Sequence, residues 1–312
     1  MKLALTGAGG WIGGRLQATA IERGIDTSAL RARAGEPLTP PPADVMIHVG
    51  GIAHDLYGQM DEAAYRAANA ELPVELARRC AEAGYRRFVF VSSSKVFGDA
   101  TTNPATEDTT CDPHGAYARA KRDAEIELAR LAPSLGLEVV VVRPPLVYGP
   151  GVGANFARLI RLADGPLPWL ASSRPARRSL VYIDNLVDAL LFLAMRPASL
   201  AGDAAAGPGV GRAAVYHVTD GPAPTVDELV GRLREALGRP RRQLRVPAIL
   251  VSTLLAMPMI GHRARRLFGS LELDSHRLLA AGWRPPVAFG EAVERTVRAW
   301  RDSGRGDRTE SG

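Results

Sequence analysis

Lys2-Leu-Ala-Leu-Thr6 runs directly into Gly7-Ala-Gly-Gly10-Trp-Ile-Gly13-Gly14 at the start of the chain. The first five residues are typical of a short buried strand, and a helical pattern follows the glycines to about Arg23. A strand, a glycine turn and a helix in this order are the context in which a dinucleotide binds, because its pyrophosphate rests on free amides at the helix N-terminus. A glycine-rich turn without a ligand is the alternative interpretation.

The glycine spacing assigns a task to each of three positions. We expect Gly7 to make the tight turn, Gly10 to let the backbone approach the phosphates, and Gly13 to let the helix close onto the sheet.

A tyrosine and a lysine, Tyr117 and Lys121, stand four residues apart in a segment, 116–131, that is predicted to be helical. At that spacing both side chains project from one face, so the ammonium can favour the ionised form of the phenol. The same spacing occurs by chance in solvated helices. However, only Lys2, Lys95 and Lys121 of the 39 basic residues are lysine, which favours a specific use of the ammonium here.

These features resemble the extended short-chain dehydrogenase/reductase superfamily over nearly the whole chain. The resemblance is carried by residues 6–13, Asp44-Val-Met-Ile-His48-Val-Gly-Gly51, Asn69, Phe88-Val-Phe-Val-Ser-Ser93-Ser, Tyr117-x-x-x-Lys121 and Arg143-Pro-Pro-Leu-Val-Tyr-Gly-Pro150. Ser93-Ser-Lys-Val, Asn155-Phe and residues 178–189 look most like bacterial UDP-N-acetylhexosamine 4-epimerases and 4-ketoreductases. The resemblance implies an α/β fold: a Rossmann doubly wound parallel sheet with a smaller C-terminal substrate-binding lobe.

The resemblance also implies catalytic roles. Ser93 would hydrogen-bond the reacting oxygen, with Ser94 as its competitor. Tyr117 would be the acid/base, and Lys121 would hold the nicotinamide ribose while lowering the pKa of the phenol. His48 is expected to pack at a strand end instead of reacting.

The cofactor that the resemblance implies is NAD(P)(H). The residues expected to contact it are Gly7, Gly10, Trp11, Ile12, Gly13, Arg31, Gly50, Gly51, Asn69, Tyr117, Lys121 and Pro144. NAD-preferring members carry an acid after the second strand, whereas Ala29-Leu-Arg31-Ala-Arg33 stands here with no carboxylate before Glu36. Arginines there would attract a 2′-phosphate, so we lean towards NADP(H).

For the substrate, the resemblance points to Ser93, Ser94, Tyr117, Asn155 and Arg178. Asn155 and Arg178 match positions that contact the diphosphate and uridine, and arginine suits a diphosphate because its planar fork gives two charge-assisted hydrogen bonds. Arg177 replaces Arg178 if the register of the loop differs by one. The further arginine that the family often carries late in the lobe has only an uncertain match among Arg263, Arg265 and Arg266.

Strand-like and helical segments alternate in the first half, as in a parallel sheet covered on both faces. The predicted strands are 2–6, 27–31, 45–49, 87–92, 138–143, 179–183 and 215–219, and the predicted helices are 11–23, 62–83, 116–131, 155–163 and 184–195. We expect the dinucleotide-binding core to comprise 1–150 and 179–220, and the substrate lobe 151–178 and 221–301. Residues 198–212 are predicted to be a mobile loop, 246–260 a buried or interfacial helix, and 302–312 a disordered tail.

Bulk properties set limits on function. The net charge of +6 is scattered and carried mainly by arginine, without the basic stripe interleaved with aromatics that nucleic-acid binding favours. Cys80 and Cys111 are too few for a disulfide framework or a zinc site, so we expect no metal and a reducing, cytoplasmic location. The strand at Lys2 leaves no room for a signal peptide, and the longest apolar run is too short to span a bilayer.

We therefore expect chemistry at C4 of a UDP-hexosamine in surface polysaccharide synthesis. Reductase and epimerase use the same residues, so the sequence leaves both open. A non-catalytic NAD(P)-binding sensor or scaffold on the same fold is the alternative from another class. The family implies a homodimer through the helix of Tyr117 and the 62–83 helix.

Overall fold

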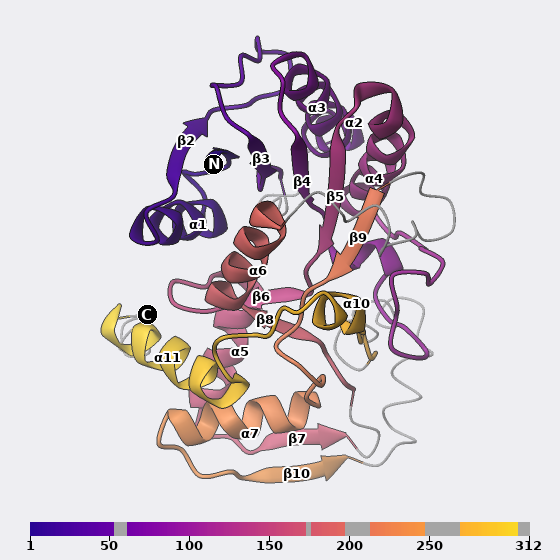
Figure 1. Cartoon of the computed structure of the whole chain (residues 1–312). Coiled ribbons are helices and arrows are strands. Elements are labelled where there is room, and N and C mark those ends of the chain that lie inside the picture. The colour runs from indigo at the N-terminus through magenta and orange to yellow at the C-terminus, as the bar shows by residue number, and fades with distance from the viewer. Residues whose placement is uncertain (53–60, 173–175, 197–212, 247–268, 305–312) are drawn as a thin grey trace.

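Figure 1 shows a computed structural model of the chain, and the structure describes residues 1–52, 61–172, 176–196, 213–246 and 269–304. The core is a parallel sheet of six strands in the order β2-β1-β3-β4-β5-β9, which confirms the predicted fold class. The strands are β1 (Lys2–Thr6), β2 (Asp26–Leu30), β3 (Val45–His48), β4 (Arg87–Val91), β5 (Glu138–Arg143) and β9 (Ala213–His217). The order reverses between β1 and β3, and ligands of such sheets bind outside the carboxyl ends of the strands at that reversal.

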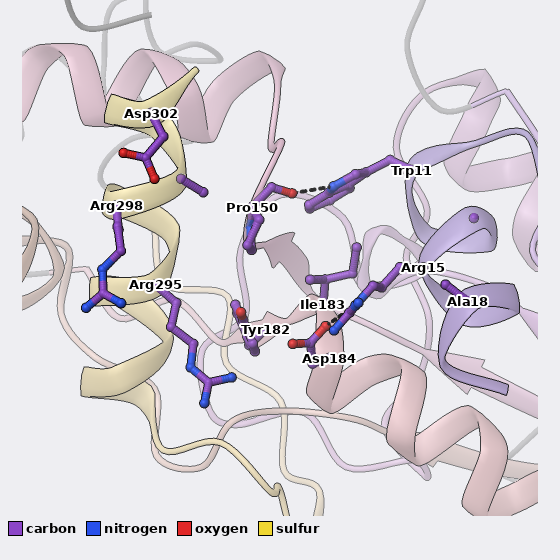
Figure 2. Close-up of a pocket in the computed structure, with 12 residues that line it drawn as sticks. Trp11, Arg15, Ala18, Pro150, Tyr182, Ile183, Asp184, Arg295, Arg298 and Asp302 are labelled. Atoms are coloured by element: carbon purple, nitrogen blue, oxygen red, sulfur yellow. Dashed lines mark hydrogen bonds and ion pairs between the residues drawn. The ribbon is translucent and has the colours of Figure 1, made fainter. Parts of the chain in front are cut away.

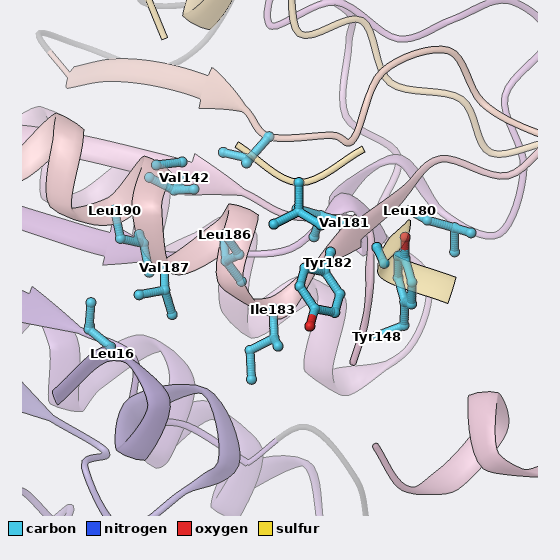
Figure 3. Close-up of a cluster of buried hydrophobic side chains, with 14 of the residues drawn as sticks. Leu16, Val142, Tyr148, Leu180, Val181, Tyr182, Ile183, Leu186, Val187 and Leu190 are labelled. Atoms are coloured by element: carbon cyan, nitrogen blue, oxygen red, sulfur yellow. The ribbon is translucent and has the colours of Figure 1, made fainter. Parts of the chain in front are cut away.

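The two faces of the sheet carry separate apolar clusters because successive strand residues point to opposite sides. Leu3 and Leu5 of β1 belong to a cluster with α1 (Trp11–Glu22) and α6 (Ile183–Met195), part of which Figure 3 shows. Ala4 belongs to the opposite cluster, with α3 (Leu72–Glu82) and α4 (Ala116–Leu135). Helices thus cover both faces, and α4 carries Tyr117 onto the second face.

The remaining elements form two small parallel sheets with their helices. In these, β6 (Leu146–Tyr148) pairs with β8 (Leu180–Tyr182), and β7 (Trp169–Ser172) pairs with β10 (Gln243–Val246). The helices are α5 (Ala154–Asp164), α7 (Val226–Ala236), α10 (His276–Ala280) and α11 (Phe289–Asp302). In Figure 1, α7, β7 and β10 gather at the end of the molecule away from α3.

Several predicted boundaries need correction. The predicted strand 27–31 is Asp26–Leu30, so Arg31 lies just beyond it, and the predicted strand 215–219 is Ala213–His217. The single helix predicted at 62–83 consists of α2 (Glu62–Arg66), a π-helical turn η1 (Ala67–Glu71) and α3.

The α4 helix continues past its predicted end at residue 131. Pro133 falls in its last turn, and the helix ends at Gly136, which adopts the left-handed conformation with φ of 60°.

The predicted loop at 198–212, and nearly all of the predicted helix at 246–260 and of the predicted tail, lie outside the described residues. Of the helices that the structure describes, none is long and apolar enough to cross a membrane.

Candidate active site

The glycine turn, residues 7–13, has no room for a side chain at Gly7, which packs against the chain after β3, or at Gly13. Gly7 has φ of 74°, and a Cβ on it would lie 2.9 Å from the amide nitrogen of Gly50. A Cβ on Gly13 would lie 2.0 Å from the carbonyl oxygen of Gly7, so only glycine lets α1 approach the turn. These contacts confirm the predicted turn at Gly7 and the predicted close approach at Gly13.

The N-terminus of α1 is free of side-chain caps. Gly10 stands at the N-cap position, and the first turn of α1 contains no acidic residue. The first amides of the helix, those of Trp11, Ile12 and Gly13, therefore face an anion-binding position. The indole of Trp11 donates from Nε1 to the carbonyl of Pro150 at 2.7 Å (Figure 2). The bare turn and these amides fit the pyrophosphate of a dinucleotide.

Asn69 holds the chain that follows β3. It is fully buried in η1 and exchanges two hydrogen bonds with the backbone of Ile52, at 3.1 and 3.2 Å. These bonds fix the backbone that follows β3 to η1. A Cβ on Gly51 would lie 2.5 Å from Oδ1 of Asn69 and 3.2 Å from Nζ of Lys121, so the bare backbone of Gly51 lies against both side chains.

His48 belongs to the core, as predicted. Its Nδ1 lies 2.7 Å from the hydroxyl of Thr6, and its ring stacks against Phe88 and Phe90 at 6.1 and 6.0 Å. Burial lowers the pKa of His48 to about 3, so the ring is neutral at physiological pH.

The three predicted catalytic residues meet at the carboxyl end of β4. The side chain of Ser93 lies beside the phenol of Tyr117 and favours its ionised form. Lys121 donates from Nζ to the carbonyl oxygen of Val91 at 2.9 Å, and its ammonium lies 4.7 Å from the ring centre of Phe90. A phenol, a hydroxyl and an ammonium thus lie together beside the strand-order reversal.

Ser93 and Ser94 are separated by their surroundings. Ser94 is buried, and its amide donates to the carbonyl of Pro144 at 2.9 Å. Ser93 is partly exposed and faces Tyr117, so the geometry favours Ser93 as the serine that bonds the reacting oxygen. Pro144 itself is buried directly after β5, where it fixes this serine loop.

The expected direction of the tyrosine pKa needs correction. We expected Lys121 to lower the pKa of the Tyr117 phenol, but burial raises it. The group that opposes the rise is Ser93, whose side chain favours the ionised phenol. The physical reason is that the phenol itself is buried, which disfavours the phenolate, while the ammonium of Lys121 is directed to the carbonyl of Val91.

Arg31 lies where the ribose end of a cofactor is expected. The parallel register pairs Thr6 of β1 with Leu30 of β2, so the exposed Arg31 follows Leu30 beside the start of the glycine turn. Arg33 is drawn towards Glu36, 3.8 Å away.

The predicted substrate arginine has a buried acid for a neighbour. Burial lowers the pKa of Arg178, and Asp99 opposes that shift. Asp99 also accepts a hydrogen bond from Lys95 at 2.7 Å, in the segment that follows Ser94. Arg177 is exposed, and its guanidinium donates to the carbonyl of Ala223 at 2.8 Å, so Arg178 is the arginine on the side of the serines.

Asn155 is the second residue of α5, and its side chain lies outside the described part. Arg263, Arg265 and Arg266 lie outside the described residues as well.

Sequence reasoning passed over two buried acids near these residues. Glu125 stands four residues after Lys121, so the same helical spacing could have found it. Asp99 carried no local signal, because only the fold brings it to Arg178.

A separate pocket of about 630 Å³ lies between α1, α6 and α11 (Figure 2). Trp11 and Arg15 of α1, Asp184 of α6, and Arg295 and Arg298 of α11 line it, and Arg15 bonds Asp184 at 2.6 Å. The residues that line it include Trp11 of the glycine turn but not Ser93, Tyr117 or Lys121.

The fold, the reversal of strand order and the glycine turn together define a Rossmann-fold protein with a dinucleotide cradle. The model of the NAD dependent epimerase/dehydratase family matches residues 3–205, and the chain belongs to this family.

Curated relatives agree with this family. The chain is 35% identical to a UDP-glucose 4-epimerase of Vibrio cholerae, over 82% of this chain and 76% of the relative. It is 32% identical to a dTDP-4-dehydrorhamnose reductase of Mycobacterium tuberculosis, over 62% of this chain and 66% of that relative.

A solved structure supports the fold alone. The structure of RMD from Pseudomonas aeruginosa complexed with NADPH superposes with a TM-score of 0.74 at 20% identity, over 96% of this chain and 99% of that one.

Proposed function

We propose that this protein is an NAD(P)-dependent nucleotide-sugar enzyme that acts at C4 of a UDP-hexosamine. It is either a 4-ketoreductase of a UDP-4-keto-6-deoxy-N-acetylhexosamine or a UDP-sugar 4-epimerase. The observation that carries the proposal is that Ser93 and Tyr117 lie side by side, with Lys121 one helical turn away, at the end of β4. Similarity to the Vibrio cholerae UDP-glucose 4-epimerase supports a sugar-nucleotide substrate.

The chain's own residues manage the proton while the bound nicotinamide supplies or accepts hydride. Ser93 hydrogen-bonds the C4 oxygen, and Tyr117 gives a proton to it in the reductase or removes one in the epimerase. Because burial raises the pKa of Tyr117, the phenol is protonated at neutral pH. This state suits donation to a keto sugar, whereas the epimerase needs Tyr117 as a phenolate before it can remove the proton of the C4 hydroxyl.

The cofactor cradle is assigned to Gly7, Gly10 and Gly13 with the first amides of α1. The positive charge of Arg31, beside the glycine turn, supports NADP(H) over NAD(H). Lys121 is assigned to the nicotinamide ribose.

For the substrate, Arg178 and Asn155 are assigned to the diphosphate and uridine. The half-buried guanidinium of Arg178 supports this role, because a partly desolvated fork binds phosphate oxygens strongly.

We further propose a cytoplasmic homodimer that serves surface polysaccharide synthesis. The dimer would form through α4 and the α2–α3 helix pair. Ile126, a 40% exposed apolar residue of α4, supports that face as an interface.

The proposal is tested by incubating purified protein with UDP-N-acetylglucosamine and, separately, with its 4-keto-6-deoxy derivative. Products and NAD(P)H are followed independently. Net oxidation of NADPH with the keto sugar identifies the reductase, and interconversion of two UDP-sugars without net cofactor change identifies the epimerase. Cofactor binding without turnover of either substrate class would contradict the proposal.

A further inference from the structure

Glu125 continues the line of side chains that Tyr117 and Lys121 begin on α4. The three residues stand four apart, so they project from one face of the helix on successive turns. Lys121 is 3% exposed and Glu125 is fully buried. A carboxyl group removed from water must be paired and hydrogen-bonded if it is to stay ionised.

Two arginines hold Glu125 in its ionised form. Arg143, at the end of β5, donates from Nε and Nη2 to the two carboxylate oxygens at 2.9 and 2.7 Å, and Arg122 donates from Nη1 at 3.0 Å. Burial alone would raise the pKa of Glu125, but the arginines outweigh it and the pKa falls. Glu125 is therefore a carboxylate at neutral pH.

Lys121 needs a negative neighbour because burial favours its neutral form. Burial lowers the pKa of Lys121 to about 8, and the charge of Glu125 opposes this. The other titratable or polar groups around this face of α4 are His48 of β3, Asn69 of η1, Tyr65 of α2, Tyr117, and Ser92 and Cys111 near the carboxylate. His48 is neutral, so among the described groups the negative charge that acts on Lys121 is that of Glu125.

The arginine partner of Glu125 also reaches the serine loop. The guanidinium of Arg143 lies 5.2 Å from the ring centre of Phe97, which ends the short turn η2 (Ser94–Phe97) directly after Ser93. The carbonyl of Pro144 accepts the amide of Ser94 at 2.9 Å. The ion pair thus joins α4, β5 and the turn that carries Ser93.

We propose that Glu125 is a positioning residue: its charge keeps Lys121 an ammonium, and its pair with Arg143 fixes α4 against the turn that carries Ser93. The inference rests on the proposed function, because an ammonium at position 121 matters only where it serves the cofactor and Tyr117.

Because the chain has three lysines, the titration of Lys121 can be followed directly by NMR. Protein labelled with ¹³C at lysine Cε gives three lysine signals. The variants Lys2→Arg and Lys95→Arg, each at an exposed side chain, assign two of these signals. The third signal then belongs to Lys121. We expect the Lys121 signal to titrate near pH 8, and its midpoint to fall by about one pH unit in Glu125→Gln. Glu127→Gln, at a partly exposed acid of the same helix, is the matched control and should leave the midpoint unchanged.

A second variant covers the case in which Glu125→Gln does not fold. The double variant Glu125→Leu with Arg143→Met removes the whole buried pair, a change that proteins often tolerate. Its Lys121 midpoint should also fall, because Glu125 is the charge that raises the pKa of Lys121. A midpoint within about 0.2 pH units of wild type in the folded variants would overturn the inference.

Cofactor affinity measured from pH 6 to 10 separates this inference from the proposed function. The affinity of the wild type should weaken above the Lys121 midpoint, and that of Glu125→Gln should weaken about one pH unit earlier. A wild type that binds neither NADH nor NADPH contradicts the proposed function while the titration of Lys121 still tests Glu125. A wild type that binds, with the same pH profile in Glu125→Gln, contradicts the inference alone.

Discussion

One hydroxyl carries the proposed proton transfer, and Tyr117→Phe removes it while keeping the ring on α4. We expect the fold and cofactor binding to survive and turnover to fall by about 10² to 10⁴. The measurement is the rate of the chemical step on a verified substrate, with cofactor affinity followed by fluorescence. Tyr65→Phe, at a nearby tyrosine of α2 with no assigned role for its hydroxyl, is the control. Retention of more than about a tenth of the turnover, with chemistry limiting, would remove Tyr117 from the mechanism.

The proposed preference for NADP(H) rests on Arg31, which follows the end of β2 beside the glycine turn. In Arg31→Asp, a carboxylate replaces the charge proposed to bind the 2′-phosphate, so NADPH affinity should fall by about ten- to a hundredfold relative to NADH. Equilibrium binding of both cofactors checks this. Arg232→Asp, at an exposed arginine of α7, should leave the ratio as in the wild type. An unchanged preference in Arg31→Asp would refute the assignment to NADP(H).

The sequence predicted which side chains lie together in the candidate site. It did not predict how deeply they are buried. The four-residue spacing of Tyr117 and Lys121 fixes a shared helix face, and the fold brings Ser93 to it as expected. The pKa of the phenol was predicted in the wrong direction because it depends on burial, which arises from packing between α4 and its neighbours. The partner of Glu125 is on β5, and no local pattern links the two.

At the scale of the element, the close fit of β1, the glycine turn and α1 gives a stability prediction. Gly13→Ala places a methyl group 2.0 Å from the carbonyl oxygen of Gly7, a clash with backbone that cannot rotate away. We expect a loss of about 2 kcal/mol or more in the free energy of unfolding, together with weaker cofactor binding. Gly9→Ala points into open space and should keep wild-type stability. Equal denaturation midpoints for the two variants would contradict this account of the turn.

Elements with strong local patterns were predicted to within a few residues, and those that depend on tertiary pairing were not. The strands at 2–6 and 138–143 were predicted correctly because they are short apolar runs in a parallel sheet. The π-helical turn at Asn69 is accompanied by bonds to Ile52 that connect distant backbone, so it has no periodic signal. The pairing of β6 with β8 joins strands that are each three residues long.

At the scale of the whole molecule, the carboxyl edge of the sheet holds the candidate site and also two buried histidines, His48 and His217. His48 ends β3 and His217 ends β9, and burial lowers the pKa of each to about 3. The Nδ1 of His217 donates to the carbonyl of Asp274 at 3.0 Å, so its neutral ring joins the sheet to the segment before α10.

These histidines make global stability depend on pH. The unfolded chain binds a proton at each ring below about pH 6.5, whereas the folded chain does not until near pH 3. The stability contributed by the neutral rings is therefore complete above pH 6.5 and is lost as the pH falls towards 3. Below pH 6.5 the free energy of unfolding should fall by about 1.4 kcal/mol per pH unit for each histidine.

His217→Asn isolates one of the two contributions. The asparagine amide can replace the Nδ1 donor to Asp274 but has no proton to gain in this range, so the slope between pH 6 and 5 should lessen by about 1.4 kcal/mol per pH unit. Urea unfolding at several pH values, followed by tryptophan fluorescence, gives the slope, whatever the stability of the variant at pH 7. His114→Asn, at a half-exposed histidine before α4, is the control. If His217→Asn keeps the wild-type slope, His217 takes up its proton in the folded protein and is not held neutral by the sheet.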